Sequence, residues 1–287
     1  MVSKQDVTNG IVKLIRKAET ELPDDVVKAL EKAYEIEEGV AKTQIEAILK
    51  NIKLAKNSKR PMCQDTGIQT FFVNVGIDFP EISNLKKIIT DGVKKATKEI
   101  PLRPNTMDPI TGENHKDNTG KHVPYITWDF VEGSDVTITA FPKGGGSENM
   151  SKLGMLKPGV GIDGVKDFVV EEMVKAAGNP CPPTVVGVGI GGGADLALKL
   201  GKRSLLRPAG VRNKNKTIAS IEEELIKRIN DSGIGPMGLG GKTTVLDVHV
   251  EVAHRHPASL PVGIAVQCWA DRRARMIIHS DGSWEVE

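Results

Sequence analysis

Apolar and polar residues near the N-terminus follow the period of a helix. The stretch from Ile11 to Ala18 places apolar residues among Lys13, Arg16 and Lys17. This spacing predicts an amphipathic surface helix and differs from the continuous apolar segment of a signal peptide. We expect helices to continue to about Asn57.

Strand and helix patterns alternate along the rest of the chain. Runs rich in β-branched and aromatic residues predict strands at 70–77, 125–130, 135–141, 184–189, 243–253, 262–268 and 275–279. Helical spacing predicts helices at 82–100, 162–177, 194–200 and 218–229. The stretch 101–123 lacks periodicity, and loops of this length in compact domains are often functional. The fold class we expect is α/β, a mixed α+β single unit with β-sheets flanked by helices, forming one domain over residues 1–287.

Composition and charge exclude several classes of protein. Hydrophobic residues make up 39% and charged residues 26% of the chain, which is typical of a soluble globular protein. The net charge of +2 is spread along the sequence and is too small to indicate a nucleic-acid-binding protein. No apolar run approaches the length of a membrane span. We therefore expect a cytoplasmic protein that binds neither nucleic acid nor a membrane.

The three cysteines, Cys63, Cys181 and Cys268, each lie in a stretch typical of turns or loops. An odd number of cysteines without a secretion signal argues against a disulfide framework. Three thiolates from distant loops would suit a [4Fe–4S] cluster with one open iron, which can act as a Lewis acid. A Cys₃His zinc site with His256 as the fourth ligand would use the same residue types, and inert buried thiols are the simplest alternative.

Six motifs carry a resemblance to a known family. In chain order they are Cys63-Gln-Asp-Thr-Gly67, Leu102-Arg-Pro-Asn105 with Asp117-Asn-Thr-Gly120, Pro142-Lys-Gly-Gly-Gly-Ser-Glu-Asn149, Pro180-Cys-Pro-Pro183, Gly235-Pro-Met-Gly-Leu-Gly-Gly-Lys-Thr-Thr244 and Cys268-Trp-Ala-Asp-Arg272. In these motifs the chain resembles the α subunit, or N-terminal domain, of class I iron–sulfur fumarases and the related tartrate dehydratases. The matches run in family order from about residue 60 almost to the C-terminus.

The resemblance implies a hydro-lyase that reversibly hydrates a C4 dicarboxylate. Fumarate to malate is the first expectation and tartrate dehydration the second. By the same resemblance, Cys63, Cys181 and Cys268 hold a [4Fe–4S] cluster whose open iron acts as a Lewis acid.

The resemblance also implies which residues bind the substrate. Arg103 falls at the position of a substrate arginine, although an isolated loop arginine is more often a solvated surface residue. The amides of Gly145 and Gly146 could bind an anion, or the glycines could simply form a tight turn. Gln64 and Asp65 directly follow a predicted cluster ligand, so we expect both to face the substrate.

Asp65 and His256 are the predicted catalytic residues. By similarity to the family, His256 should pair with Asp65 near the substrate hydroxyl and help to move its proton. From the residues alone, Asp65 could instead cap a turn, and His256 could be a packed or surface histidine.

A second domain closes the substrate pocket in this family and supplies a threonine thought to be the base. This sequence ends at Glu287, soon after the third cysteine, with no such segment. We therefore expect a separate β subunit to carry the remaining active-site residues, in an α2β2 heterotetramer.

Two glycine-rich segments favour an alternative, a nucleotide-dependent enzyme that handles NAD or phosphate. Gly187-Val-Gly-Ile-Gly-Gly192 satisfies G-x-G-x-x-G but lacks the acidic residue expected about twenty positions later. Gly241-Lys-Thr243 imitates part of a P-loop, but its first glycine is replaced by Pro236. A non-catalytic iron–sulfur or zinc-binding protein is a further alternative.

Overall fold

The computed structural model of the chain describes residues 4–80 and 82–287, which fold into two compact units. Unit 1 consists of Met1–Pro23, Asn51–Gly145 and Arg272–Glu287, and unit 2 consists of Asp24–Lys50 and Gly146–Asp271. Each unit contains a β-sheet and helices, so the expected mixed α+β class is confirmed. The assignment of residues 1–287 to one domain stays a prediction.

The sheet of unit 1 has the strand order β2-β1-β3-β8-β9. Its strands are β1 (Thr70–Gly76), β2 (Tyr125–Val131), β3 (Val136–Ala140), β8 (Ala274–Ile278) and β9 (Trp284–Val286). Strand β1 lies parallel to β2 and antiparallel to β3. A parallel pair needs a long crossover connection, and here it contains a short 3₁₀ turn η1 (Ile82–Asn84), helix α4 (Leu85–Glu99) and the long irregular loop.

Helices α1 (Lys4–Thr20) and α4 pack together and share one hydrophobic core with the sheet of unit 1. The apolar face expected near the N-terminus is buried, with Ile11 and Ile15 fully inaccessible. A Cβ atom at Gly92 of α4 would lie 2.4 Å from Ile11 Cγ2, so this glycine allows the two helices to approach closely. The amphipathic pattern of α1 therefore defines the core of unit 1.

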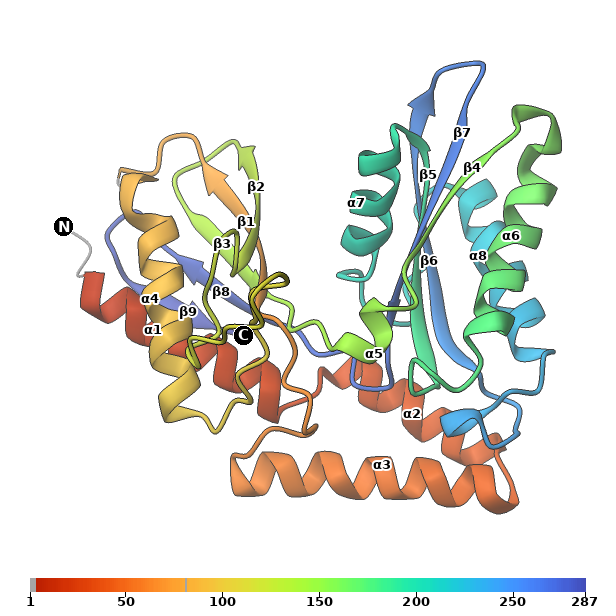
Figure 1. Cartoon of the computed structure of the whole chain (residues 1–287), viewed down its shortest axis with the longest axis horizontal. Helices are drawn as coiled ribbons and strands as arrows, with labels where there is room; N and C mark the ends of the chain where they lie inside the picture. Colours follow the sequence, from red (N-terminus) through yellow and green to blue (C-terminus); the bar gives the residue numbers. More distant parts are fainter. Residues whose placement is uncertain (1–3, 81) are drawn as a thin grey trace. The chain divides into compact units, whose positions relative to one another are not determined.

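The sheet of unit 2 has the order β4-β7-β5-β6. Its strands are β4 (Lys152–Leu156), β5 (Thr184–Gly192), β6 (Val245–Arg255) and β7 (Leu260–Gln267). Helix α7 (Ala194–Ser204) covers one face, while α6 (Gly161–Ala176) and α8 (Lys216–Asn230) cover the other (Figure 1). Because both faces are covered, every residue of β7 is buried.

The remaining elements are short or peripheral. Helix α2 (Asp24–Ile36) packs against β6, and α3 (Gly39–Ser58) begins in unit 2 and ends in unit 1. One-turn elements are α5 (Gly145–Glu148), η2 (Pro158–Val160) and η3 (Pro236–Gly238). None of the helices in the described ranges has the length and apolar character needed to cross a membrane.

The G-x-G-x-x-G segment serves helix packing in this fold. A Cβ at Gly187 would lie 2.0 Å from the Gly201 carbonyl oxygen, and one at Gly189 would lie 2.0 Å from the Ala197 oxygen. Helix α7 therefore rests directly on the backbone of β5, where a methyl group would not fit. The glycines are explained by this contact, without a dinucleotide.

Most predicted elements are present, and the differences have local causes. Helix α8 begins at Lys216, earlier than expected, because the Asn215 side chain accepts hydrogen bonds from the Thr217 and Ile218 amides. Three elements that the pattern did not predict are β4, β9 and α5, each no longer than five residues. The stretch 101–123 forms no helix or strand, as expected.

Candidate active site

Asp65 organises the loop that contains the first cysteine. Asp65 Oδ1 accepts hydrogen bonds from the Gly67 amide (2.9 Å) and from Asn105 Nδ2 (3.1 Å). Its Oδ2 accepts a hydrogen bond from the Gly145 amide at 2.7 Å. The carboxylate thus joins three segments of unit 1. The Gly145 amide expected to bind substrate donates to Asp65 here, so the predicted roles of both residues stay predictions.

Arg103 is fixed through its backbone and exposes its side chain. The Arg103 amide donates to Thr66 Oγ1 at 3.0 Å, and its carbonyl accepts from Asn118 Nδ2 at 3.1 Å. Across residues 4–80 and 82–287, the guanidinium has no hydrogen-bond or ion-pair partner. Gln64 is exposed beside Asp65. An unengaged guanidinium next to this loop can bind a carboxylate through two parallel hydrogen bonds.

The long loop that carries Arg103 is held in place by one buried amide side chain. Asn118 is 1% exposed and has a positive φ of 58°. Its Oδ1 accepts from the Asn105 amide (2.8 Å), and its Nδ2 donates to Thr97 Oγ1 (3.1 Å) as well as to the Arg103 carbonyl. The sequence analysis included Asn118 in a family motif but did not predict this structural role.

A buried ion pair that was not predicted from the sequence supports the loop that contains Cys63. Glu19, near the end of α1, is fully buried, and its Oε2 lies 2.7 Å from Arg272 Nη1. Its Oε1 accepts a hydrogen bond from Gln69 Nε2 at 3.1 Å. Burial raises the pKa of Glu19, and the Arg272 guanidinium opposes that shift. A signal was available, since Glu19 follows Ile15 by four residues on the buried face of α1.

The backbone of Glu19 also contacts the cysteine loop. Its carbonyl oxygen accepts a hydrogen bond from the Met62 amide at 2.9 Å, and Met62 directly precedes Cys63. Helix α1 therefore holds the residue before Cys63 and, through Gln69, the residue just before β1. The end of α1 therefore contacts the loop on both sides of Cys63.

In unit 2, two cysteine loops meet. The Cys181 carbonyl accepts a hydrogen bond from the Trp269 amide at 3.1 Å, and Trp269 directly follows Cys268. Cys181 has a positive φ of 55°, which is uncommon for a residue other than glycine. Both cysteines are half-buried, and neither forms a disulfide. Backbone hydrogen bonding thus joins two of the three predicted ligand loops.

His256 lies at the other end of β7 from Cys268. It sits in the turn between β6 and β7, where its Nδ1 accepts a hydrogen bond from the Ala258 amide at 3.1 Å. The eight residues of β7 span about 26 Å. His256 therefore cannot share a metal ion with Cys268 of the same chain, which argues against a Cys₃His zinc site. Its pairing with Asp65, a residue of unit 1, stays a prediction.

Gly146 and Cys63 complete the set of predicted residues. Gly146 belongs to unit 2, where an added Cβ would lie 3.4 Å from the Asn179 carbonyl oxygen. Cys63 is a half-buried free thiol in unit 1, whereas Cys181 and Cys268 belong to unit 2. No group of three or more His, Cys, Asp or Glu side chains is arranged to hold a metal ion in the residues described. The donor chemistry suits an iron–sulfur cluster, and the convergence of the three thiolates stays a prediction.

The P-loop-like segment binds a carboxylate of the protein itself. The Glu37 carboxylate accepts hydrogen bonds from the Lys242 amide (2.9 and 3.0 Å) and the Thr243 amide (2.6 Å). Glu37 is 1% exposed, and a Cβ at Gly241 would lie 2.9 Å from its Oε2. The amides that a phosphate would need are engaged, which argues against the phosphate-handling alternative.

A second buried carboxylate fixes the loop after α7. Asp247 is 1% exposed, accepts a hydrogen bond from the Gly210 amide (2.6 Å), and lies against Arg212 and His249 Nε2. Burial alone would raise the pKa of Asp247, but His249, the Gly210 amide and Arg212 together hold it below its ordinary value. The ionised carboxylate is therefore a structural part of unit 2.

The described residues thus place an exposed guanidinium beside the Cys63 loop in unit 1, and two joined cysteine loops in unit 2. The sequence matches the family described as Fumarate hydratase (Fumerase) over residues 8–277. The chain belongs to this family of hydro-lyases.

Two relatives extend the comparison. The putative L(+)-tartrate dehydratase subunit alpha of Methanocaldococcus jannaschii is 52% identical over 273 residues, covering 93% of this chain and 96% of that protein. The L(+)-tartrate dehydratase subunit alpha of Escherichia coli O157:H7 is 37% identical over 289 residues, covering 99% of this chain and 95% of that protein. The similarity therefore extends over nearly the full length of both relatives.

Proposed function

We propose that this chain is the α subunit of a dehydratase that acts on a C4 hydroxy-dicarboxylate. The observation that carries the proposal is the exposed guanidinium of Arg103, which has no partner in the described residues and is held by its backbone beside the Cys63 loop. Arg103 would bind one substrate carboxylate through two parallel hydrogen bonds, and Gln64 would contact the same substrate.

L-tartrate is the first candidate substrate, and malate with fumarate is the second. The names of two relatives that align over nearly their full length support tartrate, whereas the description of the matching family supports fumarate. Both reactions remove water from a C4 dicarboxylate, so the same carboxylate contacts would serve either one. The order differs from the sequence-based expectation, which placed fumarate first.

Cys63, Cys181 and Cys268 would hold a [4Fe–4S] cluster. The cluster would supply an open iron that polarises the substrate hydroxyl. The three thiols are free of disulfides and half-buried, which agrees with ligand positions that a small substrate must reach. Free thiols also fit a reducing compartment, so we place the enzyme in the cytoplasm.

In this proposal Arg103 is the anion clamp and the three cysteines are the cluster ligands, while the base lies on a second chain. The relatives are named as α subunits, which supports a β subunit carrying that base, in an α2β2 assembly. A positioned base typically contributes about 10²–10⁴-fold to the rate. The α chain alone, even with its metal site loaded, should therefore be at least about 100-fold less active than the complex.

The test is anaerobic turnover of L-tartrate, malate and fumarate by the iron-loaded α chain, with and without a co-expressed β chain. We expect activity only with both chains, and a preference for tartrate. Iron and sulfide should be equal in the two preparations, so that the cofactor content does not explain the difference. Full activity of α alone would refute the two-subunit proposal, and loaded complexes inactive on all three acids would favour a non-catalytic iron–sulfur protein.

A further inference from the structure

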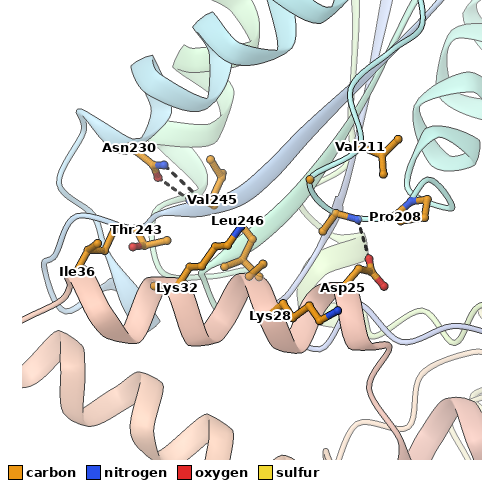
Figure 2. A pocket seen from close by; sticks show the side chains of 14 residues that line it. Asp25, Lys28, Lys32, Ile36, Pro208, Val211, Asn230, Thr243, Val245 and Leu246 are labelled. Carbon is orange, nitrogen blue, oxygen red and sulfur yellow. Dashed lines mark hydrogen bonds between the residues drawn. The ribbon is translucent and has the colours of Figure 1, made fainter.

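A pocket opens in unit 2 between α2, the loop 208–211 and the start of β6 (Figure 2). Its volume is about 540 Å³, within the usual range for small-molecule sites. Neither Cys181, Cys268 nor His256 is among its described lining residues. The pocket is therefore separate from the predicted catalytic residues of this unit.

One wall of the pocket is positively charged. Lys28 and Lys32 lie one helical turn apart on α2, and both line the pocket. Neither lysine has an ion-pair partner in the part of the chain that the structure describes. Asp25 is the one acidic residue among the described lining residues, and its Oδ2 accepts a hydrogen bond from the Ala209 amide at 2.6 Å. The two ammonium groups are thus available to an anionic ligand.

The remaining walls are mostly apolar, with one unsatisfied hydroxyl. The apolar lining residues are Ala29, Ala33, Ile36, Val211, Val245 and Leu246. Thr243 also lines the pocket, is 6% exposed, and its Oγ1 has no hydrogen-bond partner within the described residues. Buried hydroxyls nearly always have a partner, so this group is a polar exception in an otherwise apolar wall.

The backbone amides of the loop 208–211 indicate which class of anion the pocket can bind. Phosphate sites typically use several free backbone amides, but the Ala209 and Gly210 amides already donate to Asp25 and Asp247. The two side-chain ammonium groups are therefore the donors that an anion would use here, without the cradle of backbone amides typical of phosphate sites. Two lysines at positions i and i+4 are neighbours on one helix face, and their flexible stems allow both ammonium groups to reach one doubly charged ligand.

We propose that this pocket binds a small aliphatic dicarboxylate through Lys28 and Lys32, at a site outside the predicted catalytic residues. The apolar lining receives the carbon chain, and the two ammonium groups receive the carboxylates. The proposal does not depend on the reaction that the enzyme catalyses.

The test is titration of the α chain with succinate by calorimetry, at low and high salt. Succinate carries no hydroxyl or double bond, so the heat reports binding without turnover. We expect the double variant Lys28→Gln/Lys32→Gln to bind succinate at least tenfold more weakly than the wild type, because glutamine keeps the stem and helix propensity but removes the charge. The matched control Lys214→Gln/Lys216→Gln removes two exposed charges outside the pocket and should bind as the wild type does.

Two further measurements locate the site and identify the anion. Arg103→Ala removes the predicted substrate clamp, which would also bind succinate, and should keep the succinate binding that Lys28 and Lys32 provide. Inorganic phosphate should bind more weakly than succinate. Equal affinity of the Lys28/Lys32 variant and the wild type, loss of binding in Arg103→Ala, or tighter binding of phosphate would each overturn the proposal.

Discussion

Replacing Glu19 tests whether the end of α1 supports the cysteine loop. Glu19→Ala removes a charged contact of 2.7 Å to Arg272 and a hydrogen bond of 3.1 Å to Gln69, both buried. Breaking a buried ion pair typically costs about 3–5 kcal/mol of unfolding free energy. For a chain of this size that predicts a fall in melting temperature of roughly 6–20 °C. Glu19→Gln keeps the shape of the side chain and one acceptor oxygen, so its fall should be smaller.

The assay is thermal unfolding followed by tryptophan fluorescence. Two of the tryptophans, Trp128 and Trp284, pack against the core of unit 1, so the signal reports on this unit. The control is Glu21→Ala, which removes an exposed pair of 3.2 Å to Lys56 and should cost no more than about 1 kcal/mol. If Glu19→Ala melts within about 4 °C of the wild type, as the control should, the ion pair does not support this part of the fold.

Three further predictions follow from the site. Replacing Cys63, Cys181 or Cys268 with serine should each remove most of the iron and sulfide from anaerobically purified protein, and normal contents in all three variants would exclude the cluster. Arg103→Ala should lower kcat/KM by at least about 100-fold, with only partial rescue by lysine, because lysine lacks the planar fork; near wild-type values would refute the clamp. Because the folded-state pKa of Asp247 is lowered, its contribution to stability should be present above its ordinary pKa of 3.8 and lost as the pH falls through the folded value. Asp247→Asn should flatten this acid-side slope in urea unfolding measured against pH, and an unchanged slope would contradict the assignment.

Long periodic elements could be predicted from the sequence, whereas short ones could not. The apolar period of α1 is enough by itself to mark the face that is buried. Strand β4 was not predicted because one of its five residues is Gly154. The glycine is needed there because the Phe168 ring packs against it. The contact joins two different elements, so it follows from tertiary packing and not from the local sequence pattern.

The candidate site, like the fold, could be predicted from the sequence only in part. Arg103 and the cysteines could be proposed from motifs, because their chemistry is visible in the residue type. The hydrogen bond from the Gly145 amide to Asp65 could not be predicted, since eighty residues separate the two in the chain. The burial of Glu19 was not predicted because a charged residue at a helix end is ordinarily solvated, although its position on the apolar face of α1 indicated burial.

The Glu37 carboxylate accepts hydrogen bonds from the Lys242 and Thr243 amides, and this affects whether a nucleotide can bind to the segment in the cell. Because Glu37 is covalently part of the chain, its effective concentration at those amides is at least on the order of millimolar. A free phosphate or nucleotide would have to displace it in direct competition and would also have to enter a buried position. The segment therefore behaves as an anion site whose ligand is permanently attached, and nucleotide levels should leave it unaffected.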